Sequence, residues 1–179
     1  MIIVNVFDAA KEGNFEEFKR LYNGDINQVN QYTELNLLLT ALVNDCNPED
    51  KNEIVQFLLK NGIDINFRDA KYKRNALHTF FFNVMRGEPS YMLEIVRMLI
   101  ENGIDINAED KFEAIPLSYA VTVNKLKTEQ MKEIYKYLLK MGADAWHKDT
   151  FGKSCIDYAI EYSWRNDFIQ IAEEFKNGK

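Results

Sequence analysis

The chain has 179 residues, of which 46% are hydrophobic and 28% charged, and this balance excludes a wholly disordered chain. Its 22 lysine and arginine residues against 28 aspartate and glutamate residues give a formal net charge of −6. We therefore expect neither general nucleic-acid binding nor binding to an anionic membrane, because both need surplus positive charge. No apolar run approaches the roughly 18 residues of a membrane-spanning helix. Cys46 and Cys155 lack metal-type spacing and fit a reducing compartment, so we predict a cytoplasmic protein.

The first predicted unit, residues 1–26, contains two short helices. Residues 1–7 are apolar but lack the basic start and long apolar core of a signal peptide, so we expect them to belong to the first helix. Gly13 permits a tight turn after two small alanines, and Asn14 is a suitable N-cap for the second helix.

The next units repeat one pattern, in which an amphipathic helix ends at a glycine and a short polar turn follows. The pattern occupies residues 57–66, 98–107 and 137–144, with a shortened copy at 18–27. Its glycines, at positions 24, 62, 103 and 142, are spaced by 38, 41 and 39 residues. Glycine adopts the left-handed conformation that ends a helix. The spacing therefore predicts repeats at approximately 27–65, 66–106, 107–145 and 146–179, and a last helix at 166–176.

A polar turn and a second type of helix follow each pattern. Asp69, Asp110 and Asp149 open three of these turns as backbone-bonding residues, and Asn30 takes their place in the first. The helices after the turns begin near residues 75, 115 and 154.

These helices carry parts of a known motif, Thr-Pro-Leu-His-x-Ala. Pro116, Leu117 and Ala120 match it in one copy, and Leu77 and His78 match it in another. The sequence therefore resembles the ankyrin-repeat proteins. The resemblance implies an all-α solenoid with short β-hairpin-like turns, about four full repeats and an N-terminal helix pair.

The repeats are longer than those of the family, about 40 residues against 33. The surplus lies between the two helices of each repeat, at 44–51, 83–90 and 124–128. Each of these segments ends with a helix-start signal, for which we assign Asn47, Ser90 and Thr128.

No catalytic, cofactor-binding or metal-binding residues are predicted. His78 takes the position of the family's structural histidine, and His147 lies in a different turn, so the two histidines form no metal pattern. The turn aspartates recur with every repeat, which indicates turn capping rather than paired catalytic carboxylates. We therefore predict that the chain is not an enzyme.

The resemblance implies a protein partner bound by the hairpin tips and the concave helix face. Aromatic residues fall at or beside the same tip position in successive turns, and basic residues accompany them. Our candidate binding residues are Tyr32, Tyr72, Lys73, Arg74, Phe112, Phe151, Lys153 and the first-helix residue Tyr119. Two other interpretations remain: the rings pack on neighbouring hairpins, and the lysines only solvate the tips. The run 80–82, Phe-Phe-Phe, is expected to place one ring in the groove and two in the core.

Three functions remain open. The first is a monomeric protein-interaction module, whose partner has an acidic face that the basic tips bind. The second is an immunity-type or inhibitory protein that neutralises a toxin or an enzyme. The third is a self-assembling structural array. The long inter-helix turns are an alternative binding surface.

Overall fold

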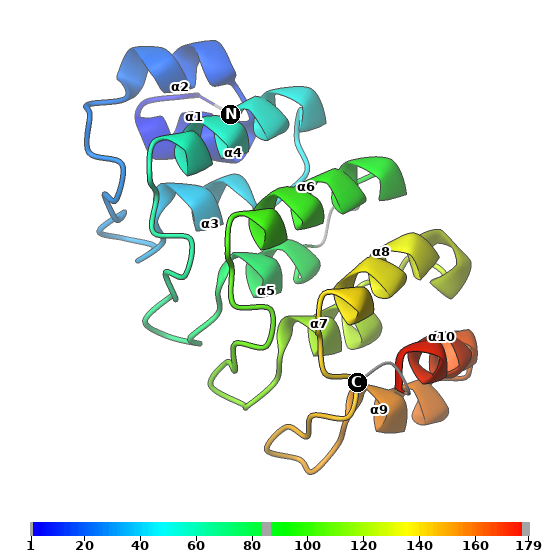
Figure 1. Ribbon diagram of the computed structural model, residues 1–179. Coiled ribbons are helices and arrows are strands. Elements are labelled where there is room, and N and C mark those ends of the chain that lie inside the picture. The colour runs from blue at the N-terminus through cyan, green and yellow to red at the C-terminus, as the bar shows by residue number, and fades with distance from the viewer. Residues whose placement is uncertain (1, 84–86, 177–179) are drawn as a thin grey trace.

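The computed structural model describes residues 2–83 and 87–176, and these fold into pairs of antiparallel helices (Figure 1). The helices are α1 (Val6–Glu12), α2 (Phe15–Leu21), α3 (Leu37–Ala41), α4 (Pro48–Lys60), α5 (Ala76–Phe81), α6 (Pro89–Glu101), α7 (Pro116–Thr122), α8 (Thr128–Lys140), α9 (Cys155–Glu161), the 3-10 helix η1 (Ser163–Arg165) and α10 (Asn166–Lys176). The described residues form no strand; an isolated antiparallel bridge joins Val29 to Asn36 in the first hairpin. The all-α prediction and the predicted last helix are confirmed.

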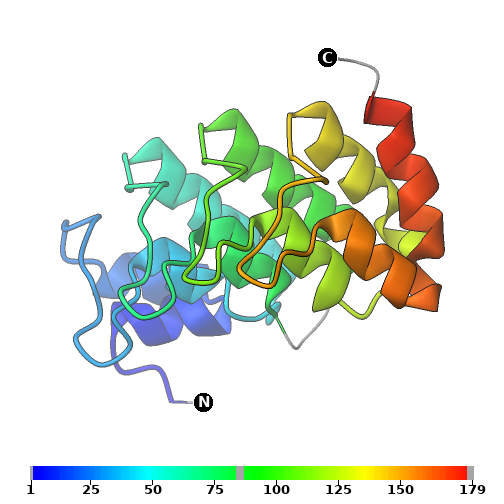
Figure 2. The same ribbon diagram turned by 90° about the horizontal axis from the view of Figure 1, so that it is seen from below.

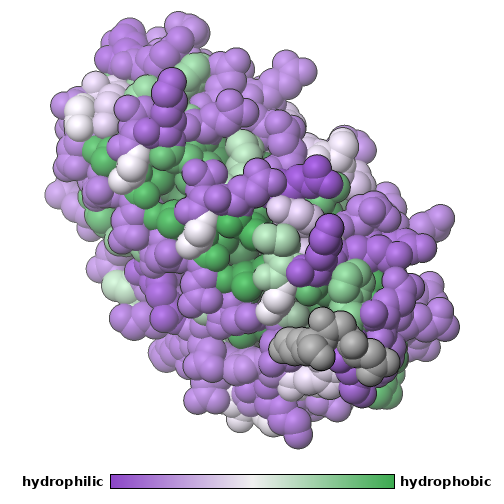
Figure 3. Space-filling model, viewed as in Figure 1, coloured by the Kyte–Doolittle hydropathy of each residue, from purple (hydrophilic) through white to green (hydrophobic). Residues whose placement is uncertain are grey.

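The helices form two layers along the stack. The inner helices α1, α3, α5, α7 and α9 pack successively on one another, and the outer helices α2, α4, α6, α8 and α10 do the same. The turns that connect each outer helix to the next inner helix lie side by side along one edge of the stack (Figure 2). Figure 3 shows that one face is largely hydrophilic, with hydrophobic side chains gathered in a diagonal band along the stack.

Asparagine and serine side chains set where most inner helices begin. The side chains of Asn36, Asn75 and Ser154 accept a hydrogen bond from the third backbone amide of α3, α5 and α9, respectively. Such N-caps satisfy amides that have no partner inside the helix. The inner helices therefore start at the same position of each repeat.

The prediction that residues 1–7 belong to the first helix is wrong for residues 2–5. Asn5 has an extended backbone and accepts a hydrogen bond from the amide of Asp8 at 3.0 Å, so it caps a helix that starts at Val6. Ile2 and Val4 lie outside the helix and are exposed, whereas Met1 lies outside the described residues.

Three of the four predicted glycine stops of the outer helices are confirmed; α2 ends at Leu21 with Tyr22 as its C-cap, so Gly24 lies beyond the helix end. Gly62, Gly103 and Gly142 have φ values of 80°, 88° and 98°, and each follows the C-cap of its helix. At the first of these stops, the amide of Ile63 donates to the carbonyl of Leu58 at 3.1 Å, which closes the helix end.

The start signals predicted for the outer helices are partly wrong. Asn47 precedes α4 but makes no capping hydrogen bond, because its φ of 48° is left-handed rather than extended. Helix α6 begins at Pro89 after Glu88, and α8 begins at Thr128 after Lys127, so Ser90 and Thr128 are helical residues and not caps. Of the long turn predicted at 83–90, residues 84–86 lie outside the described residues.

Asparagines link successive repeats along the edge where the outer helices end. The side-chain oxygens of Asn27, Asn66 and Asn107 accept hydrogen bonds of 2.7–2.9 Å from the amides of Asp64, Asp105 and Asp144 in the next repeat. The amide groups of Asn66 and Asn107 also donate to the carbonyls of Gly103 and Gly142. These bonds fix the spacing of the turns and thereby the surface that the turns present.

Two cationic side chains from other elements are fully buried against the C-terminal ends of inner helices. The Lys51 ammonium bonds to the carbonyls of Ala41 and Asn44, and the Arg165 guanidinium bonds to carbonyls at the end of α7. Both side chains satisfy carbonyls that a helix end leaves without partners.

No helix in the described ranges is both long and apolar enough to cross a membrane.

Candidate functional site

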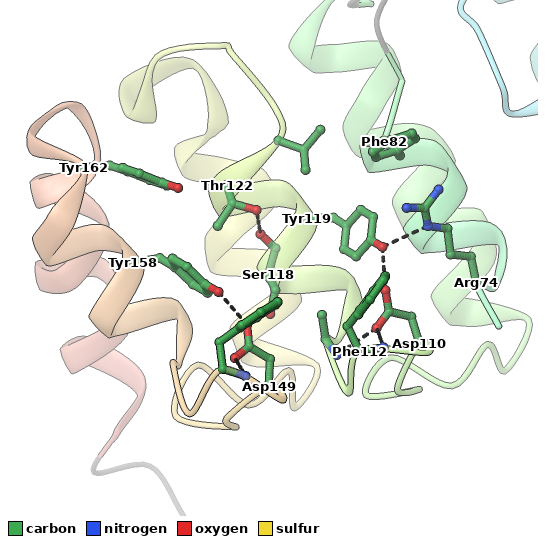
Figure 4. A pocket seen from close by; sticks show the side chains of 13 residues that line it. Arg74, Phe82, Asp110, Phe112, Ser118, Tyr119, Thr122, Asp149, Tyr158 and Tyr162 are labelled. Carbon is green, nitrogen blue, oxygen red and sulfur yellow. Dashed lines mark hydrogen bonds between the residues drawn. The ribbon is translucent and has the colours of Figure 1, made fainter. Parts of the chain in front are cut away.

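A groove of about 270 Å³ lies between three inner helices and the turns that precede them. Its walls are largely aromatic and come from α7, α9 and the residues at the end of α5 (Figure 4). The lining residues are Arg74, Phe82, Asp110, Phe112, Ala114, Ser118, Tyr119, Thr122, Val123, Asp149, Phe151, Tyr158 and Tyr162.

The aromatic lining begins part-way along the stack. The fourth position after each inner helix cap holds Thr40 and Thr79 in the earlier repeats but Tyr119 and Tyr158 in the later ones. Because these positions are equivalent in the repeat, α3 and α5 carry a small polar side chain where α7 and α9 carry a ring. The groove is therefore confined to the part of the stack between the turn before α5 and α9.

Tyr119 joins the inner helix α7 to its own turn. Its hydroxyl donates to Asp110 Oδ2 at 2.5 Å, while Asp110 Oδ1 accepts from the amides of Phe112 and Ala114. Burial, together with the Asp110 carboxylate, raises the pKa of Tyr119, so its hydroxyl stays protonated as a donor. The contact fixes the Phe112 turn against the wall of the groove.

The next repeat contains the same arrangement. The Tyr158 hydroxyl donates to Asp149 Oδ2 at 2.6 Å, and Asp149 Oδ1 accepts from the amides of Phe151 and Lys153. Burial and the Asp149 carboxylate raise the pKa of Tyr158 as well. Each groove carboxylate thus has three hydrogen-bond donors, and both carboxylates serve to hold turns in place.

Arg74 forms the end of the groove nearest α5. Its backbone amide donates to Asp69 Oδ2 at 2.8 Å, and its Nε donates to the Tyr119 hydroxyl at 2.8 Å. The guanidinium lies 4.0 Å from the ring centre of Phe82, 4.6 Å from that of Tyr72 and 5.1 Å from that of Tyr119. Stacking on three rings fixes the plane and direction of this cation.

Residues 6–110 and 48–149 match the family model described as ankyrin repeats (3 copies). The chain belongs to the ankyrin-repeat family. Ankyrin repeats are generally protein–protein interaction modules. A search of curated proteins found no match for this chain.

The ankyrin turns place the four candidate aromatic residues in different surroundings. Phe112 and Phe151 line the groove, with 40% and 71% of their surface exposed. Tyr72 is half-buried between the cations of Lys71 and Arg74. Tyr32 is 86% exposed and lies in a separate shallow pocket beside the first helix. The structure therefore brings two of the four tip rings together in one groove.

The basic candidates also differ. Lys73 is exposed at a left-handed position of its turn, with φ of 60°. Lys153 forms an ion pair of 2.7 Å with Glu161, so a carboxylate of its own repeat neutralises it. Arg74 alone among these three candidates lines the groove. Tyr119, although it lines the groove, is only 7% exposed and its hydroxyl is already bonded on both sides.

The run at residues 80–82 divides as expected. Phe80 and Phe81 are buried, whereas Phe82 is 45% exposed and lines the groove under Arg74. Tyr162 lines the far end of the groove and is not among the residues predicted from the sequence. Its place one helix turn after Tyr158 was the available signal, since residues four apart share a helix face.

His78 is a structural residue of its ankyrin repeat. Its ring is fully buried; Nε2 lies 2.9 Å from the carbonyl oxygen of Ala114, and Nδ1 lies 3.2 Å from the amide nitrogen and 2.8 Å from the side-chain oxygen of Asn75. Burial lowers the pKa of His78 to about 4, so the ring is neutral near pH 7. Within residues 2–83 and 87–176, no group of three histidine, cysteine or acidic side chains is arranged to hold a metal ion.

Proposed function

We propose that the chain is a non-catalytic module that binds a partner protein in the aromatic groove between α5, α7 and α9. Membership in the ankyrin-repeat family supports a protein as the ligand. The observation that carries the proposal is the exposure of Phe82, Phe112 and Phe151 around one concave pocket. Exposed rings at fixed positions bury large apolar area at low entropic cost, which makes them effective interface anchors.

The groove suits binding better than chemistry. Asp110 and Asp149 are the acids that line it, and each accepts hydrogen bonds from two backbone amides and a tyrosine. A general base needs a free lone pair that faces a substrate. We further propose that the chain acts as a monomer in the cytoplasm, and that inhibition of the partner follows from occupying its surface.

Capture from a lysate of the native cell tests the proposal. Wild-type chain, the groove variant Phe112→Ala/Phe151→Ala and two control variants are immobilised at equal density. The controls, Tyr32→Ala and Ile160→Ala, each remove an exposed apolar side chain outside the groove. We expect a protein that the wild-type chain and both controls retain and the groove variant loses. Equal retention by a folded groove variant would reject the groove as the binding surface.

Oligomerisation is measured separately. A self-assembling array predicts a mass that rises with concentration in light scattering, whereas the proposed module keeps the mass of one chain.

A further inference from the structure

The guanidinium of Arg74 has an unused binding edge. Nε bonds to Tyr119, but Nη1 and Nη2 make no hydrogen bond to any described residue. No described carboxylate forms an ion pair with Arg74. Arginine prefers planar contact with a carboxylate through two N–H groups at once. The Nη1–Nη2 edge of Arg74 is able to make such a contact but has no carboxylate partner among the described residues.

The surroundings keep this edge in place. Phe82 lies against the guanidinium face at 4.0 Å, Tyr72 adds a second ring contact, and Asp69 holds the backbone of Arg74. A cation that is already ordered loses little entropy on binding, and partial removal from water strengthens its pairing with an anion.

Exposed cations lie close to the free edge of Arg74. Lys71, Lys73 and Lys111 are exposed in the turns next to Arg74. The Asp110 and Asp149 carboxylates keep their negative charge, but each already accepts three hydrogen bonds from this chain and forms no ion pair with Arg74. Next to Arg74 the groove is walled by Phe82, Phe112 and Tyr119, which suits an apolar side chain.

From this arrangement we infer that the groove binds a surface segment of the partner protein in which an aspartate or glutamate side chain is adjacent to a large apolar side chain. The carboxylate pairs with Nη1 and Nη2 of Arg74, and the apolar side chain enters between the rings. This inference rests on the proposed function and specifies the chemistry of its partner.

The test uses a phage-displayed library of random linear peptides, selected on the intact chain. Clones that lose binding to the Phe112→Ala/Phe151→Ala variant are kept as groove-dependent. We expect these clones to share an acid beside an aromatic or aliphatic residue. A synthetic peptide of the shared sequence should bind Arg74→Gln about tenfold more weakly than wild type, or weaker still.

Two controls separate the pairing of Arg74 with the peptide carboxylate from a general effect of positive charge. Lys148→Gln removes the same charge from an exposed residue of the turn before α9, which does not line the groove, and should change the affinity by no more than about twofold. A peptide with the acid changed to its amide should lose affinity for wild type but little more for Arg74→Gln, because the two changes remove the same interaction.

Several results would overturn the inference. Groove-dependent peptides without a shared acid would reject it while leaving the proposed function in place. Equal weakening of the acid and amide peptides by Arg74→Gln would also reject it, since Arg74 would then act only by supporting the groove. A selection that yields no groove-dependent peptide would contradict both the inference and the proposed function.

Discussion

The guanidinium of Arg165 donates a 2.5 Å hydrogen bond to the backbone carbonyl of Asn124, which lies 41 residues earlier in the chain. The same group bonds to the carbonyls of Val121 and Leu126 at 2.9 and 2.7 Å. Arg165 comes from the last repeat, yet it closes the end of the inner helix α7 and the turn after it. One buried cation therefore joins the last repeat to the one before it.

Replacing Arg165 with methionine should destabilise the fold strongly. The variant leaves three carbonyls without their donor in a site where the side chain is fully buried. An unsatisfied buried polar group costs about 1–3 kcal/mol, so we expect a loss of about 3 kcal/mol or more in the free energy of unfolding, measured by urea titration. Arg20→Met is the matched control, because the Arg20 guanidinium is exposed and pairs with Glu17 on the surface. Equal stability of Arg165→Met and wild type would refute the capping role.

His78 should make the fold sensitive to acid. Burial lowers the pKa of the folded histidine to about 4, whereas an unfolded histidine titrates near 6.5. Between these values the unfolded chain binds a proton that the folded chain does not, so the free energy of unfolding decreases as pH falls from about 6.5 to about 4. The contribution from one group is at most about 1.4 kcal/mol per pH unit.

Urea titrations of wild type and His78→Gln at several pH values measure this contribution. Carboxylates titrate in both proteins, and the difference between the two curves isolates the histidine. The wild-type chain should lose stability faster than His78→Gln over this window. Parallel curves would show that His78 is not a buried neutral ring.

The links between repeats can be tested at Asn66. Asn66→Ala removes a 2.7 Å bond from the amide of Asp105 and a 3.1 Å bond to the carbonyl of Gly103. We expect a loss of about 1 kcal/mol and faster hydrogen exchange at the Asp105 amide. Asn61→Ala is the control, because the Asn61 amide bonds to Phe57 within its own helix. Unchanged exchange at Asp105 in Asn66→Ala would contradict the link.

Features that depend on short stretches of sequence were predicted well. Gly62 and Gly103 end their helices, and Asp110 and Asp149 cap their turns, because each interaction spans only a few residues. The predicted start of α1 is wrong because the apolar composition of residues 1–7 does not reveal that the asparagine at position 5 caps the helix.

The groove depends on contacts that local patterns do not describe. Tyr119 and Tyr158 each lie nine residues after the aspartate they contact, and this equal spacing is the signal that the sequence carries for the two contacts. The rings around Arg74 come from different repeats, so their convergence follows from the packing of α5 on α7. The bond of Arg165 to the carbonyl of Asn124 has a counterpart in the bond of Lys51 to the carbonyl of Asn44, but the arginine reaches back 41 residues, which no short sequence pattern indicates.

Alanine substitutions at two glycines can separate the stability cost of a steric clash from the cost of backbone strain. Gly13 and Gly142 both have positive φ, at 63° and 98°. A Cβ added at Gly13 would lie 2.5 Å from the carbonyl oxygen of Cys46 and 3.0 Å from Cγ of Lys51, whereas one added at Gly142 would have nothing within 4 Å. Strain alone predicts the larger cost for Gly142→Ala, because 98° is farther from the left-handed helical value near 57°. Steric contact predicts the opposite order.

We expect Gly142→Ala to cost about 1 kcal/mol in the free energy of unfolding and Gly13→Ala about 1–3 kcal/mol more. The larger loss at Gly13 arises because Cys46 and Lys51 belong to the next repeat unit, so making room for a methyl group displaces the turn that precedes α4 and the buried ammonium of Lys51. Thermal and urea unfolding of the two variants measure the order. If Gly142→Ala were the less stable variant, backbone strain and not the contact with Cys46 would be what requires glycine at position 13.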